Sequence, residues 1–324
     1  MSPPSPQILA LCLLGTAVTL EAQAVEVDSR IQPYQRARGI SGSASSIGSD
    51  TMNNLMALWL EGFRRHYPNV RIQIEGKGSS TAPPALIEGT AQFGPMSRAM
   101  KSTEKDKFEE RFGYPPTPLR TSLDALAVFV NNDNPLEGMT LPQVDAVYSK
   151  TRRGGHGEQI ARWGQLGPDG EWATARISLY GRNSASGTYG FFKSVALFKG
   201  DYRDEVKEQP GSASVVQGVT EDRYGVGYSG IGYRTSGVRV VPLAETEEMP
   251  FVGASLANVL DGSYPLGRFL YLYVNKTPGE PLDPLVREFA RFVFSREGQE
   301  IVIKDGYMPV PFEVVVEELA MLGE

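Results

Sequence analysis

The sequence predicts an α/β protein with largely parallel sheets. Short apolar or alternating runs, typical of strands, are followed repeatedly by segments that have one apolar helical face. Three of these strand-to-helix junctions contain a turn rich in Ser, Thr and Gly. Strands that alternate with helices along a chain usually form sheets covered by helices. A chain of 324 residues is long enough for two domains, each with its own core.

The first half of the chain gives the following elements. Residues 25–39 are polar and form an extended or mobile lead-in, and residues 41–51 form a Gly/Ser-rich turn. The next helix has an apolar face from Met52 to Phe63. Residues 70–74 alternate between apolar and polar side chains, and residues 123–131 are almost continuously apolar, so both are strands. Further helices are expected over residues 83–89, 103–112 and 140–148.

The second half repeats this alternation. Strands are expected over residues 177–180, 226–228, 238–243 and 269–275. Helices are expected over residues 189–198, 210–224, 255–260, 285–294 and 298–304.

The N-terminus indicates export. Ile8 to Leu20 is an apolar run too short to span a bilayer, and Ala22-Gln23-Ala24 matches a signal-peptidase site. The basic residues usual before such a run are missing from Met1 to Gln7, so a buried N-terminal helix or a misassigned start is the alternative. We predict a signal peptide over residues 1–24 and a periplasmic or secreted protein after cleavage near Ala24. Cys12, the sole cysteine, would be removed with it.

The three polar turns predict an anion site. They lie at Ser49 to Met52, Gly78 to Thr81 and Ser186 to Thr188, each before a helix. The first backbone N–H groups of a helix lack intrahelical acceptors, and the macrodipole makes that end attractive to anions. If the three helix starts converge, their N–H groups and hydroxyls surround a compact oxyanion, with charge from Arg182 and from Arg98. The alternative is three ordinary capped helices with solvated arginines.

Other classes of function fit poorly. The net charge of −6 argues against nucleic acid as a partner. His66 and His156 are the only histidines, and neither belongs to a metal-ligand spacing. No phosphate-binding loop of the nucleotide-hydrolysing type is present, and no base can be identified for Ser186 as a nucleophile. We therefore expect no enzyme, no metal and no cofactor.

At this point the sequence resembles a known family, the PstS-type phosphate-binding proteins of bacterial phosphate ABC transporters. The resemblance runs from about Ile40 to Pro311. The motifs that carry it are Gly48-Ser49-Asp50-Thr51, Gly78-Ser79-Ser80, Phe93-Gly94-Pro95-Met96-Ser97-Arg98, Arg182-x-x-x-Ser186-Gly187-Thr188, Val226-Gly227-Tyr228 and Tyr264-Pro265-Leu266-Gly267-Arg268. A closing segment, Glu297-Gly298-Gln299 followed by Gly306-Tyr307-Met308-Pro309, is also similar.

The resemblance implies a two-lobed periplasmic-binding-protein fold. Each lobe would hold a mixed, mainly parallel sheet flanked by helices, and two strands would form the hinge. We place the chain crossings near Leu123-Asp124 and Pro265 to Arg268. Lobe 1 would then consist of residues 40–123 and 269–324, and lobe 2 of residues 124–268.

The resemblance also implies which residues bind phosphate. Family contacts correspond to Thr51, the Met52 N–H, Ser79, Arg182, Ser186 and the N–H groups of Gly187 and Thr188, and Ser97 and Arg98 occupy the segment of a further contact. With their neighbours, the predicted phosphate-binding set is Ser49, Asp50, Thr51, Met52, Ser79, Ser80, Ser97, Arg98, Arg182, Ser186, Gly187 and Thr188.

Two positions depart from the family pattern. Arg98 stands where well-known members have an Asp that accepts the proton of hydrogen phosphate, and Ser184 stands where they have an acidic residue. A carboxylate acceptor rejects fully deprotonated sulfate, because two acceptors would face each other without a proton between them. Another acceptor, Asp50 or a backbone carbonyl, would have to replace it. Arg98 itself would add charge to the site, or point away and pair with Glu75 or Asp124.

The resulting hypothesis is a monomeric periplasmic receptor that closes over inorganic phosphate and presents it to a membrane permease. The alternatives are a secreted phosphatase-like enzyme on the same fold, a receptor for another oxyanion such as sulfate, and a role in sensing or surface attachment.

Overall fold

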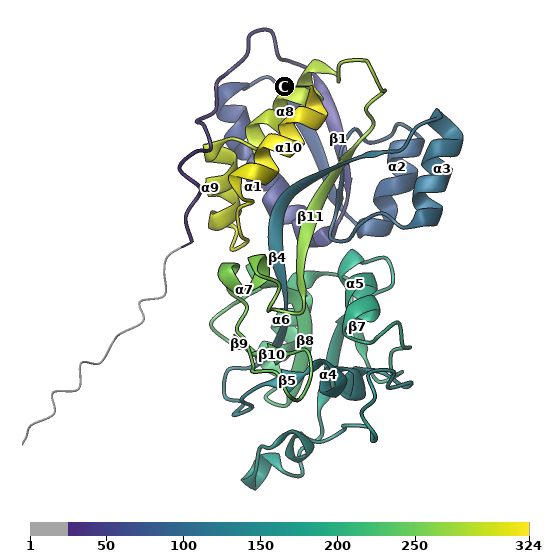
Figure 1. The fold of residues 1–324 in the computed structure, drawn as a ribbon, viewed down its shortest axis with the longest axis vertical. Helices are drawn as coiled ribbons and strands as arrows, with labels where there is room; N and C mark the ends of the chain where they lie inside the picture. The colour runs from purple at the N-terminus through teal and green to yellow at the C-terminus, as the bar shows by residue number, and fades with distance from the viewer. Residues whose placement is uncertain (1–24, 324) are drawn as a thin grey trace, which may run out of the picture.

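A computed structural model describes residues 25–323, which form two lobes stacked along the long axis of the molecule (Figure 1). The predicted signal peptide and Cys12 lie outside the described residues. We call the upper part in Figure 1 lobe 1 and the lower part lobe 2. Two long strands, β4 (Thr117–Asn131) and β11 (Gly267–Val274), pass between them.

The remaining elements divide between the lobes. Lobe 1 contains β1 (Ser43–Gly48), α1 (Asn53–His66), β2 (Arg71–Gly76), α2 (Ala82–Ile87), β3 (Gly94–Met96), α3 (Ser102–Phe112), α8 (Pro284–Val293), α9 (Arg296–Lys304) and α10 (Phe312–Leu322). Lobe 2 contains β5 (Met139–Thr140), α4 (Leu141–Tyr148), β6 (Ser178–Arg182), α5 (Gly187–Val195), β7 (Lys207–Gln209), α6 (Ser212–Glu221), β8 (Gly225–Gly230), β9 (Val238–Val240), β10 (Leu243–Ala244) and α7 (Leu256–Leu260). Short 3-10 turns include η1 (Asp50–Met52), η2 (Ser79–Thr81) and η5 (Ile231–Tyr233).

A mixed sheet runs through both lobes in the order β3-β11-β4-β8-β6-β7, and β9 also pairs with β4. The first half of β4 pairs antiparallel with β11, and its second half pairs antiparallel with β8. Strands β8, β6 and β7 pair parallel. Residues 125–130 of β4 are all buried, which explains their continuous apolar run. The sheet is mixed, as predicted, but it is not mainly parallel, because the pairings of β11 with β3 and of β4 with β11, β8 and β9 are all antiparallel. It is also one sheet shared by the lobes rather than one sheet in each, because β4 pairs with β11 in its first half and with β8 in its second.

Each lobe has its own hydrophobic core. In lobe 1 the rings of Phe63 on α1 and Phe289 on α8 pack edge to face at 5.3 Å. Helix α8 begins at Pro284 because Asp283, its N-cap, accepts hydrogen bonds from the N–H groups of Leu285 and Val286. In lobe 2 the rings of Phe192 and Tyr228 stack at 3.9 Å. Burial of each such aromatic side chain stabilises the folded state by roughly 1.5–3 kcal/mol.

Most predicted elements are present, with shifted ends, and two of the differences have clear causes. Residues 43–48, predicted as a turn, form β1, because their backbone pairs parallel with β2. This pairing outweighs the low strand propensity of their small polar side chains. The predicted strand 238–243 is two strands, β9 and β10, separated at Pro242, which has no N–H for a ladder. The strand over 123–131 begins earlier, at Thr117. Strand β3 and helix α10 were not predicted.

The lead-in before β1 contains no helix or strand, and it packs on lobe 1. The Tyr34 hydroxyl lies 2.8 Å from the Tyr67 hydroxyl and donates to Glu288, and Ile31 is buried. Within the described part of the chain, no helix has the length and apolar character needed to cross a bilayer.

Candidate functional site

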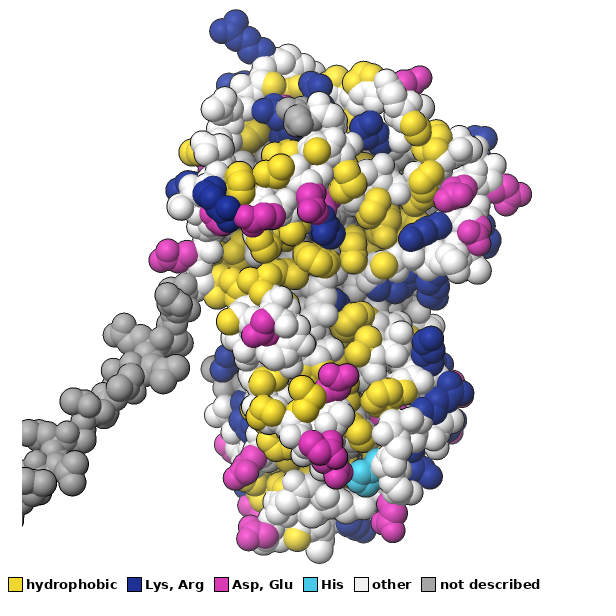
Figure 2. Space-filling model, viewed as in Figure 1, with side chains coloured by type: hydrophobic (Ala, Val, Ile, Leu, Met, Phe, Trp, Pro, Cys, Tyr) yellow, Lys and Arg dark blue, Asp and Glu magenta, His cyan; other side chains and the backbone are white. Residues whose placement is uncertain are grey.

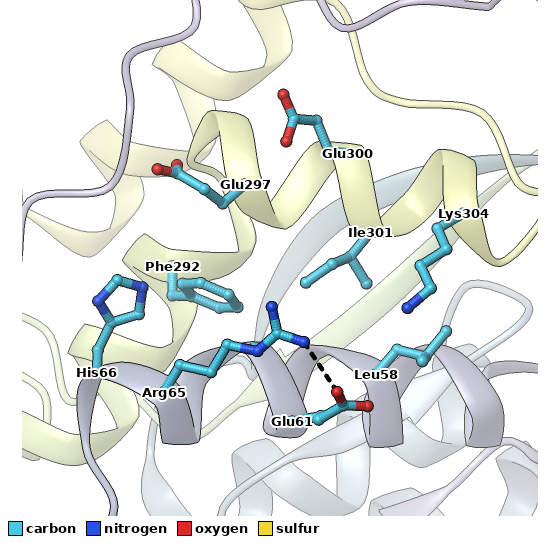
Figure 3. Close-up of a pocket in the computed structure, with 10 residues that line it drawn as sticks. Leu58, Glu61, Arg65, His66, Phe292, Glu297, Glu300, Ile301 and Lys304 are labelled. Atoms are coloured by element: carbon cyan, nitrogen blue, oxygen red, sulfur yellow. Dashed lines mark hydrogen bonds and ion pairs between the residues drawn. The ribbon is translucent and has the colours of Figure 1, made fainter.

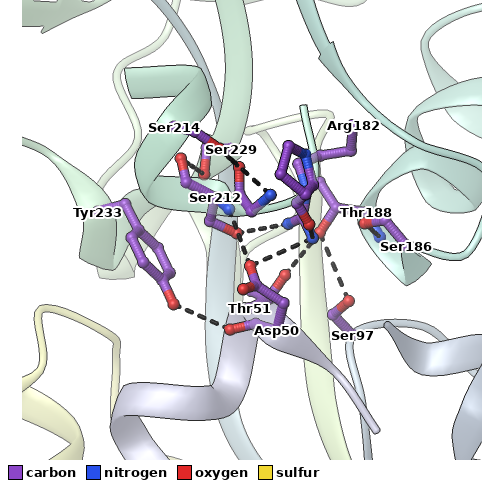
Figure 4. Close-up of polar contacts among 12 residues, drawn as sticks. Asp50, Thr51, Ser97, Arg182, Ser186, Thr188, Ser212, Ser214, Ser229 and Tyr233 are labelled. Carbon is purple, nitrogen blue, oxygen red and sulfur yellow. Dashed lines mark hydrogen bonds and ion pairs between the residues drawn. The ribbon is translucent and has the colours of Figure 1, made fainter. Parts of the chain in front are cut away.

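The three polar turns meet where the lobes face each other. Thr51 Oγ1, in η1 of lobe 1, lies 2.9 Å from Thr188 Oγ1 in α5 of lobe 2. Ser97 Oγ, just after β3, lies 3.4 Å from the same Thr188 oxygen and 3.3 Å from Ser79 Oγ in η2. Figure 4 shows Thr51 and Ser97 on one side of this junction and Thr188 and Arg182 on the other. All five side chains are buried, and we call this cluster the cradle.

Helix α5 supplies the end that faces lobe 1. Ser186 is its N-cap, and its Oγ accepts hydrogen bonds from the N–H groups of Thr188 and Tyr189 at 3.1 and 3.4 Å. Gly187 allows the lobes to touch, because a Cβ there would lie 2.2 Å from Ser79 Oγ and 2.7 Å from Ser97 Oγ. The positive end of the α5 macrodipole therefore faces the cradle.

Arg182 is the last residue of β6, and its guanidinium is buried beside the hydroxyls of the cradle. Its Nη1 donates to Ser212 Oγ at 2.5 Å, and its Nη2 donates to the Pro210 carbonyl at 3.1 Å and lies 3.2 Å from Asp50 Oδ2. Its Nε is a buried donor with no partner among the described residues. Burial lowers the pKa of Arg182, and Asp50 opposes that shift. Arginine nevertheless remains protonated in proteins, so this is a fixed positive charge with a spare donor.

Arg268, the last residue of the predicted hinge motif Tyr264 to Arg268, is a second cradle arginine. It is the register partner of Asp124, whose Oδ2 accepts from its Nε and Nη2 at 2.9 and 2.7 Å. Its Nη2 also donates to Thr188 Oγ1 at 2.9 Å, and its Nη1 donates to the Ser97 carbonyl at 2.8 Å. A charged side chain within an otherwise apolar strand, opposite an equally isolated Asp, was the available signal for such a buried pair.

Ser212 was also missed. Its N–H donates to Asp50 Oδ2 at 2.8 Å across the lobe junction, in addition to its contact with Arg182. Ser212 begins α6, so a fourth helix start reaches the site. Its sequence context, Pro210-Gly211-Ser212, is an ordinary turn before a helix, and nothing local distinguishes it.

The charges in the cradle come in matched pairs. Arg182 faces Asp50, and Arg268 faces Asp124. Binding of an anion would therefore depend mainly on preorganised hydroxyl, N–H and guanidinium donors rather than on excess charge. Charge-assisted hydrogen bonds of this kind are about twice as strong as neutral ones.

The other predicted residues lie around this centre. The Ser49 N–H donates to the Pro95 carbonyl at 2.7 Å, and the Met52 N–H donates to the Ser49 carbonyl at 3.2 Å, so both are used within lobe 1. The Ser80 N–H donates to the Ala185 carbonyl at 3.1 Å, which links the lobes beside the cradle.

Arg98 points away from the cradle, and its partner differs from the two that the sequence suggested. Its Nη1 and Nη2 donate to the two carboxylate oxygens of Glu104 on α3, at 2.8 and 2.7 Å, rather than to Glu75 or Asp124. Glu75 pairs instead with Lys77, and Asp124 with Arg268. Arg98 pairs with Glu104, six residues away on the next helix, because both guanidinium nitrogens can donate there to the two oxygens of one carboxylate.

The histidines lie elsewhere. The His66 ring, at the end of α1, packs against Tyr34 at 4.8 Å, and His156 Nδ1 lies 2.7 Å from the Glu158 carbonyl. Among residues 25–323, no group of three or more His, Cys, Asp or Glu side chains is arranged to hold a metal ion.

Comparison with known proteins identifies relatives along most of the chain. The PBP superfamily domain matches residues 36–297. The phosphate-binding protein PstS of Pseudomonas aeruginosa is 52% identical over 314 residues, covering 97% of both chains. A phosphate ABC transporter substrate-binding protein from Clostridium perfringens, solved with bound phosphate, has a TM-score of 0.71 at 26% identity and covers 83% of this chain and 100% of its own. A phosphate transport receptor from Vibrio cholerae has the same fold, with a TM-score of 0.64 at 20% identity, covering 83% of this chain and 100% of its own.

Proposed function

We propose a function from the premise that this chain belongs to the PBP superfamily and, within it, to the PstS phosphate-binding proteins. The protein captures inorganic phosphate between its two lobes and serves as the substrate-binding protein of a phosphate ABC transporter. The observation that carries this proposal is the cradle, where hydroxyls from both lobes, the start of α5 and two buried arginines converge.

Binding would use the donors already aimed at the cradle. The unpartnered Nε of Arg182 and the hydroxyls of Thr51, Ser79 and Thr188 would donate to phosphate oxygens. The contacts between Thr51 and Thr188 and between Ser97 and Thr188 join residues of opposite lobes. A ligand that bonds both sides would therefore favour the closed arrangement over the open one, because it has more partners there.

Asp50 is the best candidate for the acceptor that Arg98 replaces. Both oxygens of Asp124 are occupied, since Oδ1 accepts from the Ile231 N–H and Oδ2 accepts twice from Arg268. Asp50 Oδ2 accepts from the Ser212 N–H and faces Arg182, whereas its Oδ1 makes no hydrogen bond among the described residues. A carboxylate with a free oxygen can accept the proton of hydrogen phosphate and would disfavour sulfate.

The remaining features complete the proposal. The lobes divide at Leu123-Asp124 and near Arg268, the residues before Val25 form a cleaved signal peptide, and the mature protein works in the periplasm as a monomer beside its permease. We treat the protein as a receptor rather than a phosphatase, because Ser186 Oγ caps α5 and both histidines lie outside the cradle. The named relatives are binding proteins of transport systems.

Calorimetric titration of the mature protein with phosphate, sulfate and arsenate tests this function. Tight binding of phosphate and arsenate with much weaker binding of sulfate is expected, because the first two carry a proton that an acceptor recognises. Sulfate binding as tight as phosphate binding would refute phosphate selectivity, and steady turnover of an aryl phosphate that is abolished by Arg182→Ala would favour the enzyme.

A further inference from the structure

A second anion-binding feature lies beside the cradle, in a cavity of about 390 Å³ between the lobes. Its lining includes four cationic side chains, Arg98 and Lys101 from lobe 1 and Lys193 and Lys199 from lobe 2. No acidic residue is among the described residues that line it. We call this cavity the basic pocket. In Figure 2, basic side chains gather on the edge of the molecule where α3 and α5 lie closest.

Only part of this charge is neutralised. Arg98 is paired with Glu104, and Lys193 Nζ lies 2.9 Å from Asp201 Oδ1. Within the described part of the chain, neither Lys101 nor Lys199 takes part in an ion pair. The two unpaired lysines come from opposite lobes, so the pocket carries excess positive charge on both walls. A cleft whose low-dielectric walls carry charges of one sign raises the local concentration of counter-ions between them.

The backbone around Lys199 is held in an unusual conformation. Phe198 and Lys199 have φ angles of 49° and 63°, in the left-handed region that non-glycine residues rarely adopt. The Lys199 N–H donates to the Lys193 carbonyl at 2.8 Å, and Arg153 Nη1 donates to the Lys199 carbonyl at 3.0 Å. These bonds fix the chain after α5 so that both lysines line the same cavity. Such strained positions are most common at functional sites.

The basic pocket borders the cradle directly. Ser186, the N-cap of α5, and Ser80, whose N–H reaches the Ala185 carbonyl, line the pocket and adjoin the cradle residues Thr188 and Ser79. Ser80 and Ser186 therefore form a border that the pocket shares with the cradle. The pocket also changes with closure, because its walls belong to different lobes.

Another cavity, of about 280 Å³ between α1 and α9, lacks these properties (Figure 3). Its apolar floor includes Leu58 and Ile301, and its rim carries both signs, with Arg65 paired to Glu61 at 2.9 Å. It lies within lobe 1 and shares no residue with the cradle. Nothing there selects an anion.

We propose that the basic pocket is an outer subsite for a phosphoryl oxyanion, next to the cradle. It holds incoming phosphate before the lobes close, or the second phosphoryl group of a short condensed phosphate whose first group occupies the cradle. The chemistry is the same in both cases, because ammonium groups and hydroxyls donate to phosphoryl oxygens. This inference rests on the proposed function, since it assumes that phosphate enters the cradle.

The test compares two double variants with the same loss of charge. Lys101→Gln with Lys199→Gln removes the two unpaired pocket lysines. Lys105→Gln with Lys107→Gln, on the exposed face of α3, is the matched control. Rapid mixing measures the association and dissociation rates of phosphate at low and high ionic strength, and calorimetry measures the affinity for pyrophosphate. Thermal melting of each variant checks that the fold is intact.

Two results would support the subsite and would distinguish its ligands. If the pocket collects free phosphate, the pocket variant lowers the association rate by about three- to ten-fold at low ionic strength, with little change at high salt. If it holds a condensed phosphate, the wild-type protein binds pyrophosphate, and the pocket variant loses that affinity while phosphate affinity remains. Equal behaviour of the pocket and control variants in both measurements would overturn the subsite. Absence of phosphate binding in the wild-type protein would instead overturn the proposed function.

Discussion

Arg268 and Asp124 form a buried ion pair at the point where the two hinge strands cross between the lobes. Asp124 Oδ2 accepts from Nε and Nη2 of Arg268 at 2.9 and 2.7 Å, and both side chains are almost fully excluded from solvent. The same guanidinium donates to Thr188 in lobe 2 and to the Ser97 carbonyl in lobe 1. One side chain thus connects the hinge to both walls of the cradle.

Arg268→Ala is expected to destabilise the protein by about 3–5 kcal/mol, because it leaves the Asp124 carboxylate buried and unpaired. The double variant Arg268→Ala with Asp124→Asn should recover part of this loss, since it removes the uncompensated charge. Urea unfolding of the two variants measures the difference. If the double variant is no more stable than Arg268→Ala, burial of an unpaired Asp124 charge is not the cause.

Gly187→Ala is expected to prevent full closure of the lobes. The added Cβ would lie 2.2 Å from Ser79 Oγ on the opposite lobe. Overpacking of this kind costs roughly 1–3 kcal/mol, so phosphate affinity should fall by about ten-fold or more. Gly253→Ala is the control, because its Cβ would meet nothing within 4 Å. Calorimetry gives the affinity, and unchanged binding by Gly187→Ala would show that the ligand-bound form is less closed than this structure.

Asp50→Asn tests the acceptor proposed for hydrogen phosphate. An amide can turn its N–H₂ toward the ligand, so the variant should bind sulfate better relative to phosphate, by about ten-fold. Competition titrations with the two anions measure this ratio. A ratio equal to that of the wild-type protein would assign the acceptor to another group.

Asp305 should make stability depend on pH. It follows α9, and burial raises the pKa of its carboxyl from 3.8 to about 7. Only at about pH 3 or below is the side chain mostly protonated in both the folded and unfolded states, so that it contributes little difference in stability. As pH rises toward 7, the unfolded state releases this proton first, so ionisation favours unfolding. The loss of folding stability caused by ionising Asp305 reaches its full size only above the folded-state pKa of about 7.

Asp305→Asn should therefore melt at nearly the same temperature as the wild-type protein at about pH 3 and at a higher temperature at about pH 8. Asp106→Asn, on the exposed face of α3, is the control for loss of one carboxylate. Thermal melting across this range is the measurement. Parallel curves for Asp305→Asn and the wild-type protein would contradict the raised pKa.

The sequence was sufficient for features that depend on local pattern. The apolar run of β4, the polar turn before α5 and the amphipathic face of α1 each follow from residues close together in the chain. Features set by long-range partners were not predictable in this way. Strand β1 exists because β2 pairs with it. Arg98 has a nearer partner, six residues along the chain, but it reaches Glu104 only because α3 places that carboxylate beside it.

The same distinction applies to the site. Arg182 and Ser186 were identified because they flank a recognisable turn. Arg268 and Ser212 were missed because each becomes part of the cradle only through partners far away in sequence, such as Thr188 and Asp50. Arg268 carried only the sign of a charge within an apolar strand, which does not reveal Thr188, and Ser212 carried no local sign of Asp50.

The most direct test of the central claim is calorimetric titration of phosphate into Arg182→Ala and into its control, Arg176→Ala, an exposed arginine on the same approach to β6. Removing a buried, hydrogen-bonded charge costs roughly 2–5 kcal/mol, so Arg182→Ala should lose about 100-fold or more in affinity with its fold retained. Arg176→Ala should bind as the wild-type protein does. Wild-type phosphate affinity in a folded Arg182→Ala variant would contradict the assignment of phosphate to the cradle.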